Sequence, residues 1–131
     1  MASGPTFLTP LLRQPARPWA LHNRNTGATL AGRVLAAVDS ETRRRGLLGR
    51  THLEDEALVI APCNAVHTFF MKFSIDVIFV DRHGAVTRVA RAVQPWRITG
   101  ALRAFAVIEV AAGTAARTRT TTGQSLILTA D

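Results

Sequence analysis

The sequence of 131 residues contains one cysteine, Cys63, and one lysine, Lys72, and it has no long apolar run. A lone cysteine excludes an internal disulfide, which agrees with a reducing compartment. The longest apolar runs are far shorter than the roughly 20 residues that a membrane span requires. The N-terminus also lacks the apolar core of about 7 to 15 residues that defines a signal peptide. These absences predict a cytoplasmic protein without a membrane span.

Acidic residues are also few, with 9 Asp and Glu against 16 Lys and Arg and a formal charge of +7. Residues 1–53 carry eight arginines and two acids, whereas residues 54–131 carry eight basic residues and seven acids. This distribution favours a solvated arginine-rich surface over a phosphate-binding face. Because the sequence has no glycine-rich phosphate loop and no interleaving of aromatic and basic residues, we expect no nucleic-acid partner.

The length and the hydrophobic content of 47% allow one folded domain. Four of the six prolines fall within the first 18 residues, where each removes a backbone donor and favours extended geometry before it. We therefore predict a disordered or loosely docked tail over residues 1–20 and a single β-rich domain over residues 21–131. Leu11, Leu12 and Trp19 are apolar side chains by which the tail could dock.

Apolar and β-branched segments between turn residues predict about seven short strands. They cover residues 29–38, 57–61, 66–73, 75–80, 85–93, 104–110 and 125–129. One short helix is expected over residues 41–50 with Asp39 or Ser40 as its cap, and Gly46 indicates a close backbone approach or an early end. A further helical turn is expected near residues 113–117. The pattern is typical of a mainly β protein with one short helix, a compact sandwich or barrel-like single domain.

Three sequence blocks together resemble one known family. They are RGLLGR at 45–50, TFFMKFSIDVIFVD at 68–81 and VIEVAAGTAART at 107–118. In this order they are similar to the bacterial and archaeal family called domain of unknown function 192. The resemblance covers residues 25–130 approximately and implies a mainly β sandwich, but it carries no established activity.

The family pattern also places individual residues in this chain. It implies that the basic and glycine positions of the first block fall on Arg45, Gly46 and Arg50, and that the acids of the later blocks fall on Asp76 and Glu109. The chain departs from the commonest form at Phe70, where tryptophan is usual, and in a shorter connection before Asp76. The resemblance therefore identifies a short cytoplasmic branch.

Cys63, His67 and Met71 follow one another at intervals of four residues. Either a strand or a helix would place their side chains on one face. Thiolate, imidazole and thioether form the soft ligand set that favours Cu(I), or Zn²⁺ with a further ligand. On one straight strand the outer two lie about 13 Å apart, so a metal site requires a turn. The alternatives are a packed core histidine and methionine, or a nucleophilic pair of Cys63 and His67 oriented by Asp76 or Glu109.

Glu109 lies in an apolar strand and shares its face with Phe105 and Val107. Burying an unpaired carboxylate costs several kcal/mol, so we expect Arg45 or Arg50 to pair with it. The simple interpretation is an ion pair that joins the helix to the sheet, and the functional one is a polar ligand pocket. Asp81 is expected to be the acid of a hairpin turn.

The preferred interpretation is a small non-catalytic binding or accessory module with a polar pocket or patch beside the sheet. Its candidate binding residues are Arg45, Arg50, His67, Met71, Asp76 and Glu109. The first alternative is a soft-metal protein that uses Cys63, His67 and Met71, and the second is a cysteine-dependent hydrolase or transferase. We expect no cofactor, and a protein or a small polar ligand as the partner. The sequence does not indicate an oligomeric state.

Overall fold

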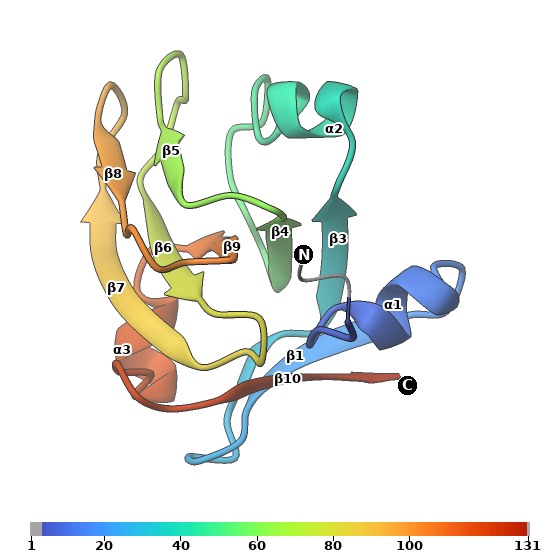
Figure 1. Cartoon of the computed structure of the whole chain (residues 1–131). Coiled ribbons are helices and arrows are strands. Elements are labelled where there is room, and N and C mark those ends of the chain that lie inside the picture. The colour runs from blue at the N-terminus through green and yellow to red at the C-terminus, as the bar shows by residue number, and fades with distance from the viewer. Residues whose placement is uncertain (1–3, 131) are drawn as a thin grey trace.

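The structure is a computed structural model that describes residues 4–130. Within these residues it contains ten strands and three short helices (Figure 1). The helices are α1 Thr9–Arg13, α2 Ser40–Arg45 and α3 Thr114–Thr118. The strands are β1 Trp19–Asn23, β2 Thr29–Ala31, β3 Arg33–Ala37, β4 Glu56–Ile60, β5 Ala65–His67, β6 Ile75–Val80, β7 Val86–Val93, β8 Ile98–Gly100, β9 Ala106–Ala111 and β10 Leu126–Ala130.

The strands form three sheets rather than a closed barrel. A five-stranded sheet has the order β3-β4-β9-β6-β7, a three-stranded sheet has the order β10-β1-β2, and β5 pairs with β8. Within the five-stranded sheet β3 and β4 are parallel and the other pairs are antiparallel. The expected mainly β single domain is confirmed. Of the three short helices in residues 4–130, α2 and α3 lie where a helix and a helical turn were expected, whereas α1 was not predicted.

The two faces of the five-stranded sheet carry different cores, because side chains alternate along each strand. One face, with Val59, Ile78 and Ile108, packs against the three-stranded sheet. The other face includes Ile60 and Val107 and packs against the segments that contain α2 and β5. In Figure 1, β1 and β10 run across the direction of β3 and β7. The second face, whose cover is made of short elements, is the one that carries the candidate site.

The segment before β1 lies against the first core. Leu8 and Leu11 are 1% and 5% exposed and belong to this core. The amide of Phe7 donates to the carbonyl of Arg82 at 2.8 Å. The disordered or loosely docked tail over residues 1–20, of which residues 1–3 lie outside the described residues, stays a prediction, and a substitution of Leu8 tests it.

The expected strand over residues 29–38 is divided at Gly32. Its amide donates to Asp55 Oδ1 at 2.8 Å, and a Cβ at this position would lie 2.5 Å from Asp55 Oδ2. A side chain here would displace the Asp55 carboxylate and disturb this hydrogen bond. The chain therefore leaves the three-stranded sheet after β2 and enters the five-stranded sheet as β3.

The expected strand over residues 66–73 is wrong after His67. Thr68, which is fully buried, directs its backbone and hydroxyl to the loop at residues 94–97 instead of to a neighbouring strand. Phe70 then has a left-handed backbone with φ of 66°. Aromatic and β-branched composition predicted a strand here, but tertiary hydrogen bonds decide the local conformation.

The expected helix over residues 41–50 is shorter than predicted. Asp39 is its cap and accepts from the Thr42 amide at 2.8 Å. The helix ends at Arg45 because Gly46 has a φ of 46°, which confirms the early end indicated by this glycine. A tight turn at residues 46–49 follows and directs Leu47 into the second core.

Candidate ligand pocket

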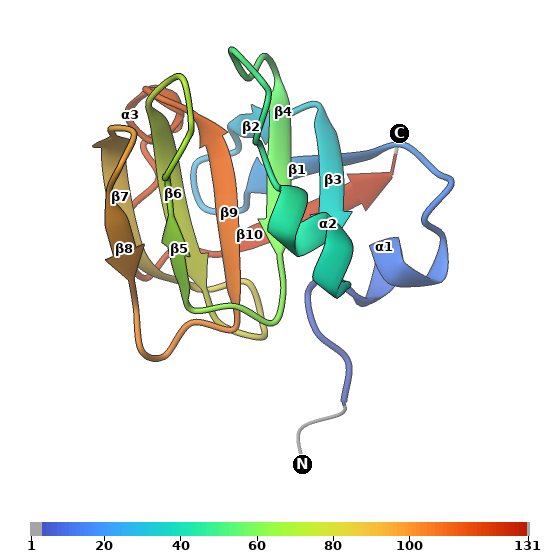
Figure 2. The same cartoon turned by 90° about the horizontal axis from the view of Figure 1, so that it is seen from above.

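A pocket lies between the two segments that cover the second face of the five-stranded sheet. Figure 2 shows α2 and β5 on the same side of this sheet, with α2 beside β3 and β4 and β5 over β6. The pocket has a volume of about 320 Å³. It is lined by Arg43, Arg44, Arg45, Gly46, Leu47, Leu48, Ile60, Cys63, Ala65, Val66, His67, Phe69, Met71 and Glu109. Its lining is apolar except for a few groups, as is usual for small-molecule sites.

Glu109 provides the acidic group of the pocket and comes from the central strand β9. It lies opposite Leu58 of β4 and Val77 of β6 in the register of the sheet. The residue is 4% exposed. Within residues 4–130 its carboxylate takes part in no ion pair. In residues 4–130, every polar side-chain atom that is fully enclosed has a hydrogen-bond partner. The carboxylate of Glu109 has no such partner in these residues, so it is not fully enclosed. It therefore opens toward the pocket that it lines.

Burial raises the pKa of Glu109 from 4.5 to about 7, because desolvation disfavours the charged carboxylate. In the described part of the chain Glu109 pairs with neither Arg45 nor Arg50, so the expected ion pair is wrong. No positive charge there offsets the cost of removing the Glu109 carboxylate from water. A carboxyl group with this pKa changes charge near neutral pH. The ionised carboxylate can pair with a cation, and the protonated carboxyl group can donate a hydrogen bond.

The three arginines of α2 provide the basic side of the pocket. The guanidinium of Arg43 donates to the carbonyl of Pro62 at 3.0 Å and thereby joins α2 to the chain before β5. Arg44 and Arg45 are exposed, and the ion pairs of residues 4–130 do not involve them. The helix is capped by the carboxylate of Asp39. A hydrogen bond from the Thr42 amide lowers the pKa of this carboxyl group. An ionised cap therefore holds the helix that presents Arg44 and Arg45.

Cys63, His67 and Met71 all line this pocket, because the chain turns before β5 and again after it. The Cys63 thiol donates to the carbonyl of Ala65 at 3.1 Å, and His67 Nδ1 accepts from the Phe69 amide at 3.3 Å. In the described part of the chain the cysteine and the histidine form no hydrogen bond with each other. His67 is exposed and stacks on Phe69 at 4.7 Å, so it is not the packed core histidine of one alternative.

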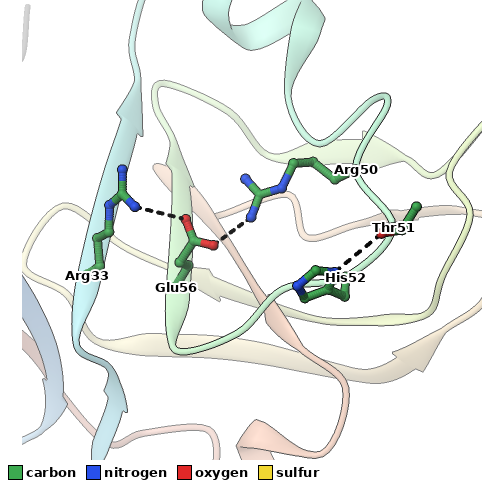
Figure 3. Close-up of polar contacts among 5 residues, drawn as sticks. All are labelled: Arg33, Arg50, Thr51, His52 and Glu56. Atoms are coloured by element: carbon green, nitrogen blue, oxygen red, sulfur yellow. Dashed lines mark hydrogen bonds and ion pairs between the residues drawn. The ribbon is translucent and has the colours of Figure 1, made fainter.

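Arg50 and Asp76 lie outside the pocket lining. Arg50 pairs with Glu56 at 2.5 Å, and Arg33 lies 3.9 Å from the same carboxylate (Figure 3). This cluster joins β3, β4 and the turn after α2. Asp76 is 1% exposed and accepts from the amides of Ala92 and Ala115 at 2.8 and 2.9 Å. It thus joins β7 and α3 to β6, and the structure does not bring it to the other candidate residues.

Three remaining expectations concern a metal site, the turn acid Asp81 and a membrane span. Across residues 4–130, no group of three or more His, Cys, Asp or Glu side chains could hold a metal ion. Asp81 is the acid of the β6–β7 turn, as expected, and accepts from the amides of His83 and Ala85. The same span contains no helix long and apolar enough to cross a bilayer.

Sequence reasoning missed several residues of the pocket. Leu47 and Ile60 contribute apolar walls, Phe69 lines the side formed by β5, and Arg44 joins Arg45 at the basic side. The arginine run at 43–45 was a signal that could have indicated Arg44, but Phe69 lay in a segment interpreted as a regular strand. Pocket residues from turns have no periodic pattern by which a sequence reveals them.

The fold and the pocket define a small mainly β domain in which both faces of the five-stranded sheet carry a core and one of them also carries the pocket. The chain belongs to the family domain of unknown function 192, described as "Uncharacterized ACR", which matches residues 21–128. The resemblance carried by the three sequence blocks is thereby confirmed.

The similar proteins agree with this assignment. A UPF0127 protein of Thermococcus sibiricus is 37% identical over 82 residues, which are 59% of this chain and 53% of that protein. The chain thus spans about half the length of this curated relative. A solved structure of a protein of unknown function from Novosphingobium aromaticivorans has a TM-score of 0.71 at 24% identity and covers 83% of this chain and 82% of its own. A proposed transcription regulator from Sinorhizobium meliloti has a TM-score of 0.72 at 21% identity, covering 84% of this chain and 91% of its own. At these identities both structures establish the fold alone.

Proposed function

We propose that the protein is a small non-catalytic binding module of the cytoplasm. Its pocket would take a molecule with an apolar body, a cationic amine at one end and an anionic group at the other. The observation that carries this proposal is the Glu109 carboxyl group, which is 4% exposed and opens into the pocket without a partner in the described part of the chain. Burying a carboxylate without a partner is costly, so a ligand cation would recover part of that free energy.

The rest of the lining supports the two other parts of the ligand. Leu47, Ile60 and Met71 are buried apolar walls, which favour an aliphatic or aromatic body. Arg44 and Arg45 are exposed at the pocket and would attract an anionic group. An amphoteric molecule would therefore satisfy both ends of the pocket, whereas a purely anionic one would leave Glu109 buried and unpaired.

Three probes of equal length test this proposal: ε-aminohexanoate, hexylamine and hexanoate. We expect ε-aminohexanoate to bind most tightly by calorimetry, hexylamine more weakly and hexanoate least. Hexylamine binding should tighten as pH rises through about 7, because the Glu109 carboxyl must ionise to pair with the amine. Binding should also shift the NMR signals of residues that line the pocket.

Two variants separate the two charged ends. Glu109→Gln keeps the shape of the side chain and should weaken hexylamine binding by about thirtyfold or more. Replacing Arg44 and Arg45 with Gln should weaken ε-aminohexanoate and leave hexylamine unchanged. Arg24→Gln, on an exposed turn without a side-chain contact to the pocket, is the matched control. Equal affinities for hexylamine and hexanoate, or full hexylamine binding by Glu109→Gln, would reject the proposal.

A second candidate is a soft-metal site, which is favoured by one observation: Cys63, His67 and Met71 line the same pocket. Titration with Cu(I) in the presence of a competing chelator should then give one site, which is lost in Cys63→Ser. A thiol nucleophile is the remaining alternative and has weaker support, because the Cys63 thiol donates to a carbonyl rather than to His67. Slow alkylation of Cys63 by iodoacetamide at neutral pH is expected if the thiol has no activating base.

A further inference from the structure

A second surface lies at the end of the β5–β8 pair and uses residues that do not line the Glu109 pocket. Phe70, Trp96 and Ile98 are 68%, 55% and 73% exposed. The rings of Phe70 and Trp96 lie against each other with centroids 4.6 Å apart. We call these three residues the aromatic tip. Adjacent apolar side chains that remain this exposed mark an interaction site.

The aromatic tip is held in place by the buried Thr68. Its carbonyl accepts from the amides of Met71 and Trp96, and its hydroxyl oxygen accepts from the amide of Arg97 at 2.8 Å. Phe70 and Trp96 have φ angles of 66° and 67°, a region that bulky side chains rarely adopt. The hydrogen bonds of Thr68 thus hold two strained backbones in a conformation that exposes both rings. Such strain is typical of functional positions rather than of loops selected for stability.

The charge around the aromatic tip has one sign. Residues 61–74 and 82–105 contain β5, β7, β8 and the loops around them, and together they have one lysine, five arginines and no Asp or Glu. Lys72 and Arg97 follow the two tip rings closely in sequence and are exposed. Arg91 and Arg103 are exposed on the same segments. The segments that carry the apolar tip therefore have charged side chains of positive sign only.

From these observations we propose that the aromatic tip docks on an anionic lipid surface, with Phe70 and Trp96 inserted at the headgroup level and Lys72 and Arg97 against the headgroups. Apolar insertion and electrostatic attraction are the two contributions that reversible membrane binding requires together. Tryptophan is also the residue that favours the interface between headgroups and acyl chains. Trp96 stacks on Phe69 with ring centroids 5.6 Å apart and meets Phe70 at an interplanar angle of 59°, so neighbouring rings occupy part of the surface on which a nucleic-acid base would stack.

Trp96 provides a direct measurement of docking. The chain has two tryptophans, and Trp19 is 8% exposed in the first core. In a Trp19→Phe background, whose folding is checked by circular dichroism, all tryptophan fluorescence comes from Trp96. We expect a blue shift and co-sedimentation with vesicles of phosphatidylcholine and phosphatidylglycerol, and neither effect with phosphatidylcholine alone. Partitioning should fall steeply with added salt.

Matched variants separate the aromatic and the basic contributions. Phe70→Asn should weaken partitioning by about tenfold, because asparagine tolerates the left-handed backbone but cannot insert. Lys72→Gln and Arg97→Gln should each weaken it by about fivefold. Leu12→Asn and Arg24→Gln change residues that are also exposed but lie on α1 and the β1–β2 turn, and these variants should bind as the wild type does.

Four results would overturn this proposal. These are a folded wild type that does not bind anionic vesicles, equal binding to neutral vesicles, full binding by Phe70→Asn, or a dimer in solution that Phe70→Asn dissociates. The last would identify a second copy of the chain as the occupant of the tip. Independence from Glu109 is checked with Glu109→Gln, which should bind vesicles normally even if it no longer binds hexylamine.

Discussion

Replacing Glu109 with glutamine should change how the stability of the protein depends on pH. In the native state burial raises the pKa of Glu109 from 4.5 to about 7, because the carboxylate is desolvated. Between these two pKa values the native state holds a proton that the unfolded chain releases. The native state therefore binds more protons there, and the free energy of unfolding falls as pH rises from 4.5 to about 7. Above this window the penalty is complete and constant.

The magnitude follows from the difference between the two pKa values. Because each tenfold change in an equilibrium constant is about 1.4 kcal/mol, the window is worth about 3 kcal/mol. Glu109→Gln is neutral at every pH and retains the shape of the side chain, so it lacks this term. We expect the variant to gain about 3 kcal/mol relative to the wild type between the acid and alkaline ends of the window, or roughly 10 °C in Tm.

Urea denaturation of both proteins from about pH 4.5 to about pH 8 measures this difference. All other side chains are the same in both proteins, so their contributions cancel in the comparison. Glu54→Gln is the matched control, because it makes the same change of side chain at an exposed position. A difference between wild type and Glu109→Gln that stays constant with pH would refute the argument that the carboxyl is buried without a partner.

Three further substitutions test the cap of α2, the hydrogen bonds of buried Asp76 and the packing of the segment before β1. Asp39→Ala should lower the midpoint of urea denaturation, because the cap of α2 and its bond to the Thr42 amide are lost; an unchanged midpoint would show that α2 needs no cap. Asp76→Ala should cost about 3 kcal/mol or more by the same assay, since two backbone amides lose a charged acceptor; a change within about 0.5 kcal/mol would contradict this role. Leu8→Ala should cost about 2 to 5 kcal/mol, whereas Leu12→Ala, with a side chain that is half exposed, should be nearly neutral. Equal effects of the two leucine substitutions would mean that the segment before residue 20 is not part of the folded unit.

The sequence was informative about Glu109 because strand alternation is a local property. Its parity with Val107 placed it on a buried face, and the structure confirms this position. Its partner was not predictable from local pattern. Arg50 is drawn to Glu56, six residues later, and Arg45 ends on the exposed side of a helix shortened by Gly46. Which arginine meets which acid depends on how the turn after α2 packs, and no periodicity records that.

The strands were predictable where they are long and apolar, and obscure where they are short. Residues 75–80 and 85–93 were identified from β-branched composition and the turn between them. β1 was missed because prolines precede it and it has only five residues. β8 was missed in a loop marked by proline and glycine. The excess of positive charge in the β5–β8 region was also not predicted. It depends on which segments lie together in space, which the order of charges along the chain does not reveal.

The hydrogen bonds around Thr68 also determine how the region beneath the aromatic tip moves. Two loops separated by more than twenty residues share this one residue, through the amides of Thr68, Met71, Trp96 and Arg97. We expect these amides to exchange with solvent only when the hydrogen bonds of Thr68 to the two loops break. They should therefore exchange with a common protection factor, as one cooperative opening unit within the larger fold. The tip would then be lost or kept as a whole, and we expect neither loop to rearrange without the other.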